Sequence, residues 1–122
     1  MNSQELKSRT KKLAIRIIRL VEALPHNRIS DVLGRQLLRS GTSVGANYRA
    51  VCRAKSTSDF INKLRIVEEE CDESLYWMEL LIEAQQMKAP RLASLMKETD
   101  EILSIIVASA KTARSSLRVR KS

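Results

Sequence analysis

The sequence predicts an all-α protein, an antiparallel up-down-up-down four-helix bundle. Leu, Ile, Ala, Lys, Arg and Glu dominate its 122 residues, and only four aromatic residues and three glycines occur, a composition that favours helices. Apolar residues recur at steps of three and four, and short polar segments interrupt the pattern. Short connections make successive helices antiparallel neighbours. A chain of this length suits one domain, here residues 1–122.

The apolar pattern sets the helix boundaries. Leu6, Leu13 and Ile17 mark the first helix, which Pro25 ends. Pro90 suits the first turn of the last helix, because an amide hydrogen would have no helical partner there. We expect the third helix to be the longest and the basic C-terminal residues to fray. The predicted helices are 4–24, 30–55, 59–88 and 90–114, followed by a basic tail at 115–122.

The second predicted helix contains Gly41 and Gly45, each of which weakens a helix by about 1 kcal/mol relative to Ala. A break near residues 40–43 is therefore the alternative to one continuous helix. We expect continuity, because the apolar register passes through the glycines without a slip and small residues let another helix approach closely. Ser30 and Asp31 are available to cap the start of this helix.

The two cysteines, Cys52 and Cys71, fall near the end of the second helix and within the third. If the turn between these helices lies near Ser56 and Thr57, antiparallel pairing separates the cysteines by about 15 Å along the axis, at about 1.5 Å per residue. A disulfide requires Cα atoms within about 7 Å. We therefore expect no bridge between them, and we interpret both as small buried residues.

The candidate catalytic and metal-binding residues do not form a constellation. His26 is the only histidine, which excludes a histidine cluster for zinc. The spacing of Arg19 and His26 resembles a ribonuclease motif of small helical nucleases, but Pro25 breaks the helix before the histidine, so we treat the match as chance. Consecutive acids at 68–70 point in different directions on a helix and make a poor metal site. We expect no catalytic residue, no cofactor and no metal, and hence no enzyme.

Signatures of phosphate loops, nucleophile elbows and membrane insertion are also missing from the sequence. No run of about 18 apolar residues is present, and the polar N-terminus lacks the apolar segment of a signal peptide. We therefore expect a cytoplasmic protein that does not enter the membrane.

The net charge of +8 is unevenly distributed. Residues 1–58 contain 12 Lys and Arg against 3 acids, residues 59–106 contain 5 against 11, and residues 107–122 contain 5 against none. The first two helices and the tail are thus basic, and the third helix and most of the fourth are acidic. Basic surfaces attract nucleic-acid phosphates, although they can equally form an ordinary solvated face or pair with the acidic helices.

Basic residues of the first helix recur at three and four residues and form one stripe about 15 Å long. The stripe and the tail have few acids nearby in the sequence. Antiparallel registry, by contrast, brings the arginines of the second helix near the acids of the third, with Arg39 within reach of Glu70 or Glu73. We therefore expect nucleic-acid binding to depend on the stripe and the tail rather than on the second helix. The candidate nucleic-acid-binding residues are Arg9, Lys12, Arg16 and Arg19 of the stripe and Arg114, Arg118, Arg120 and Lys121 of the tail.

Residues 35–47, RQLLRSGTSVGAN, resemble the signature of the 23S ribosomal RNA intervening-sequence protein family, a family of four-helix bundles. The end of the long third helix near Met87 lies where that family places it, so the resemblance covers about residues 5–114. The chain departs from the family after Asn47, and the acidic run of the third helix indicates a distinct subgroup. The motif residues that we identify are Arg39, Ser43, Gly45 and Asn47, with Glu70 and Glu73 on the third helix.

The resemblance implies a homopentameric barrel without known enzymatic activity. A relative in fold, the accessory variability protein of diversity-generating retroelements, is a basic pentamer that associates with nucleic acid and a reverse transcriptase. Apolar residues outside the main helical stripes also favour an oligomer that covers them; they are Ile15, Ile18, Val107 and Leu117. We therefore predict a non-enzymatic homo-oligomer, a pentamer by resemblance, that associates with RNA or a nucleic-acid enzyme through basic surfaces. The alternatives are a protein–protein assembly or adaptor module without nucleic-acid binding and, with less support, a DNA-binding regulator.

Overall fold

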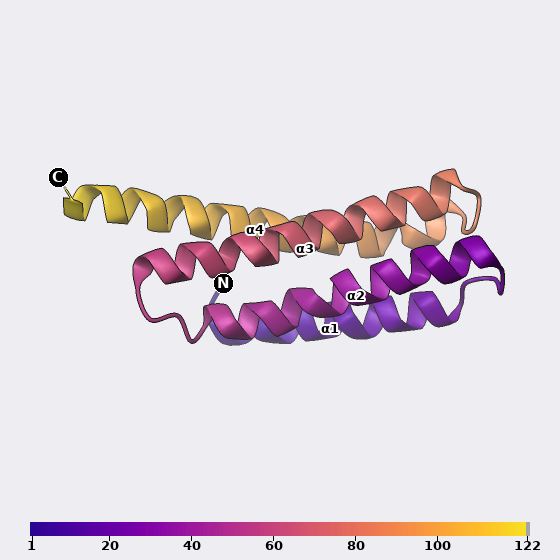
Figure 1. Cartoon of the computed structure of the whole chain (residues 1–122), viewed down its shortest axis with the longest axis horizontal. Coiled ribbons are helices and arrows are strands. Elements are labelled where there is room, and N and C mark those ends of the chain that lie inside the picture. Colours follow the sequence, from indigo (N-terminus) through magenta and orange to yellow (C-terminus); the bar gives the residue numbers. More distant parts are fainter. Residues whose placement is uncertain (122) are drawn as a thin grey trace.

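The computed structural model describes residues 1–121, apart from the side chain of Lys121, which lies outside the described part. The described residues form four α-helices, α1 (Ser3–Glu22), α2 (Arg28–Val51), α3 (Thr57–Glu83) and α4 (Ala89–Lys121). Each helix packs antiparallel to the next, and α1 closes the ring against α4 with the sparsest of the four contacts (Figure 1). The predicted antiparallel up-down-up-down four-helix bundle is confirmed. None of these helices is long and apolar enough to cross a bilayer.

Side-chain caps begin three of the helices. Asn2, Asn27 and Ser56 each accept a hydrogen bond from the backbone amide three residues further on. Each cap satisfies a donor that the first helical turn leaves unpaired. The cap of α2 is therefore Asn27, and the caps expected from the sequence, Ser30 and Asp31, lie inside the first turn instead.

The predicted C-terminal ends of α1, α2 and α3 extend a few residues too far. Leu24 and Met87 lie in the connections, yet both are buried, so their apolar spacing continues the helical pattern where the helix has already stopped. In the connection after α3, Gln85 adopts the left-handed backbone region with a φ of 59°. A left-handed residue is a common way to end a helix, but Gln is not the residue type that signals it.

α4 is the longest helix, with 33 residues against 27 in α3, and it includes the segment that was expected to fray. Both expectations were wrong, because one side of this segment packs against the bundle: Ala110 is buried, and Leu117 is half-buried. Near the end of α4, Arg120 Nη1 donates to Thr57 Oγ1 at the start of α3, at 3.3 Å. Figure 1 shows the end of α4 running past α1 and α2 and beyond the start of α3.

α2 runs without a break through Gly41 and Gly45, as predicted. A Cβ atom at Gly41 would collide with the side chain of Ile17 on α1, and one at Gly45 would press on Thr10. The glycines thus let α1 and α2 approach closely, which offsets their low helix propensity. The rest of the core between the four helices consists mainly of Leu, Ile and Val side chains.

The two cysteines are unbridged, as predicted, but their surroundings differ. Cys71 is fully buried, and burial raises the pKa of its thiol to about 12 because the thiolate would lose its hydration. Cys52 is exposed, contrary to expectation, because it follows Val51 as the C-terminal cap of α2 and lies outside the core.

Candidate nucleic-acid interface

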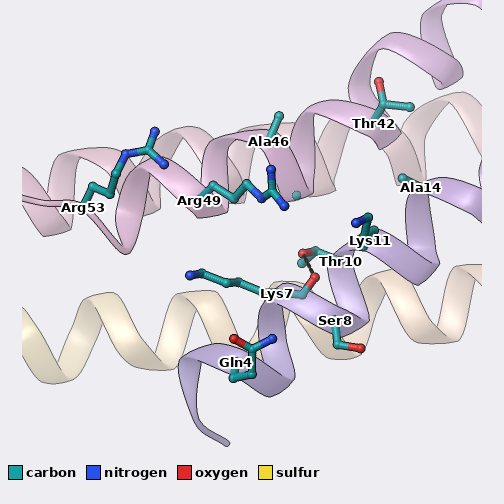
Figure 2. Close-up of a pocket in the computed structure, with 11 residues that line it drawn as sticks. Gln4, Lys7, Ser8, Thr10, Lys11, Ala14, Thr42, Ala46, Arg49 and Arg53 are labelled. Atoms are coloured by element: carbon teal, nitrogen blue, oxygen red, sulfur yellow. Dashed lines mark hydrogen bonds between the residues drawn. The ribbon is translucent and has the colours of Figure 1, made fainter.

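A basic groove of about 670 Å³ lies between α1 and α2 (Figure 2). We call it the α1–α2 groove. Its floor consists of small residues, namely Thr10, Ala14, Thr42, Gly45 and Ala46. Its rims carry four cations, namely Lys7 and Lys11 of α1, Arg49 of α2, and Arg53 just after the end of α2.

The four rim cations come from the two sides of the groove, two from each side. Lys7 and Lys11 are one turn apart on α1, about 6 Å along its axis. Arg49 lies in the last turn of α2, and Arg53 follows two residues after the helix ends at Val51. The close approach at Gly45 holds the two helices together beneath them. Figure 2 shows Lys7 and Arg49 extending into the space between the helices from opposite sides. Both pairs of cations therefore line the same groove.

No counter-charge balances these cations in the described part of the chain. The groove has no acidic lining residue, and none of its four rim cations takes part in a hydrogen bond or ion pair through its side chain. The hydroxyl of Thr10 in the floor already donates to the Lys7 carbonyl, at 3.1 Å. Like charges that share a groove repel one another, and a bound anion relieves the repulsion. Ammonium groups and forked guanidinium groups together suit phosphate.

The basic stripe predicted on α1 is largely engaged, most strongly at Arg9. Its Nε donates to Glu98 Oε2 at 3.0 Å, and its Nη2 donates to Glu98 Oε1 at 2.5 Å and to Glu101 Oε2 at 3.2 Å. Hydrogen bonding to Arg9 holds the pKa of the Glu98 carboxyl below its usual range and raises the pKa of Arg9 in turn. The stripe has few acids nearby in the sequence, but α4 brings Glu98 to Arg9 from 89 positions away.

The other stripe residues divide between bound and unbound. Arg16 donates to Ser94 Oγ of α4 at 2.9 Å, and Arg19 pairs with Glu22 on α1 itself at 3.1 Å. Lys12 is the one stripe residue whose side chain has no partner among the described residues. The role of the stripe in nucleic-acid binding therefore stays a prediction, with Lys12 its most available member.

Arg39 of α2 makes the predicted contacts with α3. Its Nη2 donates to Glu73 Oε1 at 2.6 Å, and its Nη1 donates to Glu70 Oε2 at 3.5 Å. Burial, reinforced by Glu73, raises the pKa of Glu70, and Arg39 opposes the shift only in part. Arg49 and Arg53 were expected to lie near the acids of α3, as Arg39 does, but they do not. Ten residues at 3.6 per turn rotate Arg49 by about 80° from Arg39, and Arg53 lies beyond the end of α2. They line the α1–α2 groove instead.

The tail residues lie around the end of α4 rather than at the groove. Arg114 and Arg118 are exposed and have no partner among the described residues, whereas Arg120 is bound to Thr57. The side chain of Lys121 lies outside the described part. Nucleic-acid binding by the tail stays a prediction.

The motif residues of α2 serve the helix itself and its packing. Ser43 Oγ donates to the Arg39 carbonyl at 2.6 Å, and Asn47 Nδ2 donates to the Ser43 carbonyl at 2.9 Å. Gly45 permits the contact with α1 and contributes to the floor of the groove. Conversely, the sequence interpretation missed all four rim cations. A detectable signal existed, since each pair has four-residue spacing and borders the small residues of its own helix.

Metal-binding clusters of His, Cys, Asp or Glu do not occur among residues 1–121 as described. His26 is exposed in the connection between α1 and α2, and Arg19, its partner in the nuclease-like spacing, is bound to Glu22. The basic groove is thus the site with the most distinctive chemistry, because four unpaired cations line it.

Comparisons with known proteins agree with this fold. No curated protein sequence matches the chain significantly. A crystal structure from Bacteroides thetaiotaomicron, described as a protein with unknown function from the S23 ribosomal protein family, is 36% identical with a TM-score of 0.84. The alignment covers 91% of this chain and 99% of that one. Residues 2–108 match the 23S rRNA-intervening sequence protein family. The resemblance in the sequence is thereby confirmed, and the chain belongs to the 23S rRNA-intervening sequence protein family.

Proposed function

We propose that this protein is a non-enzymatic RNA-associated protein that binds the phosphate backbone in the α1–α2 groove. The observation that carries the proposal is a set of four cations without counter-charge around one groove. Stable folding does not require such a cluster, because unpaired like charges weaken a fold slightly. Four cations at this spacing gain most when several linked phosphates bind them together.

The lining of the groove favours contact with the backbone over recognition of sequence. It contains no aromatic side chain to stack on a base and no acidic or amide side chain apart from Gln4 to accept hydrogen bonds from base edges. Binding should therefore be largely independent of sequence and steeply dependent on salt, since each neutralised phosphate releases counterions. The family name, which refers to ribosomal RNA, supports RNA as the nucleic acid.

Salt titration of RNA binding tests this proposal. We would replace Lys7, Lys11, Arg49 and Arg53 together by Gln and measure fluorescence anisotropy of a labelled RNA at a series of salt concentrations. The expected result is much weaker binding to a single strand and a shallower salt dependence. The slope should fall by about 0.7 for each phosphate that the variant no longer neutralises.

A matched control removes the same net charge elsewhere. Four other cations without side-chain partners among the described residues serve for this purpose, namely Arg28, Arg65, Lys88 and Lys97. Their replacement by Gln should change affinity far less. Equal losses in the two quadruple variants would show that total charge, and not the groove, attracts RNA, and the proposal would fail.

Self-assembly is the second candidate function, and the outer face of α3 favours it. This face exposes carboxylates without ion pairs in the described residues, namely Glu69, Asp72, Glu79 and Glu83. A molecule that is basic on one side and acidic on the other can join head to tail, and a ring forms if the rotation closes. We propose a homo-oligomer, a pentamer by family resemblance. Exposed apolar residues such as Val107, whose side chain is 40% exposed, support assembly further.

Light scattering of the purified protein distinguishes these functions. A species of 13.8 kDa at micromolar concentration would exclude the oligomer. If the quadruple groove variant dissociates the oligomer, the groove binds the acidic face of another subunit and the protein is an assembly or adaptor module. If the variant stays assembled but loses RNA, the RNA-binding function is supported.

A further inference from the structure

The α1–α2 groove continues into a shallow apolar depression on the outer side of α1. Ser8 and Lys11 line both the groove and the depression, which has a volume of about 530 Å³. Ile15 is the apolar centre of this depression, and its side chain is 50% exposed. Lys12 and Arg16 complete the lining. Exposed aliphatic surface is thus placed directly beside the unpaired cations of the groove.

We propose that groove and depression form one track for unpaired nucleotides, with phosphates in the groove and one base lying over Ile15. This inference rests on the proposed function and adds a substrate class to it: single-stranded rather than double-stranded RNA. The track would extend from Arg53 and Lys7 at one end to Ile15 at the other.

The helical spacing allows one nucleotide to reach both parts of the track. Ile15 follows Lys11 by one turn of α1, about 6 Å along the axis. A phosphate held by Lys11 therefore leaves its own base within reach of the Ile15 side chain. The aliphatic stems of Lys11 and Lys12 widen the apolar surface, because such stems lie along apolar neighbours while the ammonium groups stay in water.

An apolar contact of this kind discriminates between single strands and duplexes. In a duplex the base faces are stacked inside and only phosphates, sugars and groove edges are presented to a protein. An unpaired base exposes its apolar face and gains by covering another apolar surface. The effect tolerates any sequence, because every base has such a face. The groove alone would accept both forms, whereas the groove with Ile15 favours the single strand.

The cations around Ile15 make a polyanion its most suitable occupant. Lys11, Lys12 and Arg16 surround the isoleucine, and no acid lines the depression. Glu98, which interacts electrostatically with Arg16, accepts hydrogen bonds from Arg9. An apolar side chain of a second subunit would have to approach through this positive rim, which favours a partner that brings both an apolar surface and negative charge. A nucleotide has both.

The test compares Ile15→Ser with a matched control, Ile29→Ser, in the full-length protein. Ile29 on α2 has nearly the same exposure, 49% against 50%, and lines neither the groove nor the depression. The probes are a labelled oligouridylate and an RNA duplex of equal length. We expect Ile15→Ser to weaken oligouridylate binding about threefold to tenfold and to leave duplex binding and the salt slope unchanged. We expect Ile29→Ser to change neither.

The outcomes separate this inference from the proposed function. Equal effects of Ile15→Ser on both probes, or no effect, overturn the single-strand track, while loss of binding in the quadruple groove variant would still uphold the RNA-binding function. Dissociation of an oligomer by Ile15→Ser, with RNA binding retained, would assign the depression to a second subunit and overturn the inference. Unchanged binding in the quadruple groove variant would overturn both. A gain in oligouridylate affinity for Ile15→Trp, without a gain for the duplex, would support the track independently of any loss of folding.

Discussion

α1 meets its two neighbours in contrasting ways. Against α2 it packs closely, with Ile17 opposite Gly41, and the cations at the edge of that contact are left without partners. Against α4 the contact is sparser, and Arg9 links the helices through Glu98 and Glu101. α1 thus carries cations around much of its circumference. The neighbouring helix determines which of them pair with protein groups and which remain available to a ligand. Spacing within α1 alone cannot make that distinction.

The largest expected effect is on the closely packed side of α1. Gly41→Leu should lower the free energy of unfolding by about 1–3 kcal/mol, because the new side chain overlaps the fully buried Ile17 and forces α1 and α2 apart. Urea unfolding followed by circular dichroism measures the change. Ala108→Leu, at an exposed position of α4 away from the groove, is the control and should be nearly neutral. Similar stabilities for the two variants would show that the glycine is not needed for close packing.

The next largest loss of stability is expected when the contact between α1 and α4 is removed. Arg9→Ala should cost about 1–2 kcal/mol, because it removes charged hydrogen bonds at a side chain that is only 25% exposed. Arg39→Ala should cost less, since the Arg39 side chain is 49% exposed and water screens its ion pairs. A double-mutant cycle of Arg9 with Glu98 measures the coupling directly. A greater loss for Arg39→Ala would reverse the ranking of the two contacts.

The pH dependence of stability should distinguish Glu98 from Glu70. The pKa of Glu98 is lowered in the fold, so its contribution is present above its unfolded pKa, about 4.3, and is lost as the pH falls through the lower folded value. Glu98→Gln should therefore reduce the loss of stability in acid. The pKa of Glu70 is raised, so its contribution is present below the unfolded value and is lost as the pH rises through the folded value. Unfolding measured between about pH 3 and pH 7 should show opposite slopes for the two contributions.

The smallest effect is expected at the groove, and it should have the opposite sign. Arg49→Gln should raise the free energy of unfolding by about 0.2–0.5 kcal/mol at low salt, because one of four neighbouring like charges is removed. The gain should vanish at high salt, where the repulsion is screened. Lys97→Gln on α4 provides the control. A loss of stability for Arg49→Gln would indicate a structural role for this arginine and would weaken the contrast between the two sides of α1.

Most of the fold could be predicted from the sequence, because each helix packs on the next helix in the chain and short connections leave little freedom. The errors occurred at the ends. Leu24 and Met87 extend the apolar pattern although they lie in connections, and Gln85 adopts a positive φ without the glycine that usually signals it. At the C-terminus, a polar and basic composition concealed the inner side formed by Ala110 and Leu117.

The candidate site was less predictable, for a geometric reason. The Arg39 contacts with Glu70 and Glu73 were predicted because one short connection fixes the registry of α2 and α3. The contact of Arg9 with Glu98 joins the first and last helices, whose registry depends on three connections and two helix lengths. The groove required knowing which sides of α1 and α2 face each other. It also required knowing that no acid among the described residues pairs with the four cations.

The exposed thiol at the end of α2 offers a built-in attachment point for a spectroscopic reporter. Cys52 is adjacent in the chain to Arg53 on the rim of the groove, whereas Cys71 is buried and its raised pKa keeps it as an unreactive thiol. A maleimide dye should therefore label the native chain at a single position, without any engineered cysteine. Its emission would follow the filling and emptying of the groove in real time.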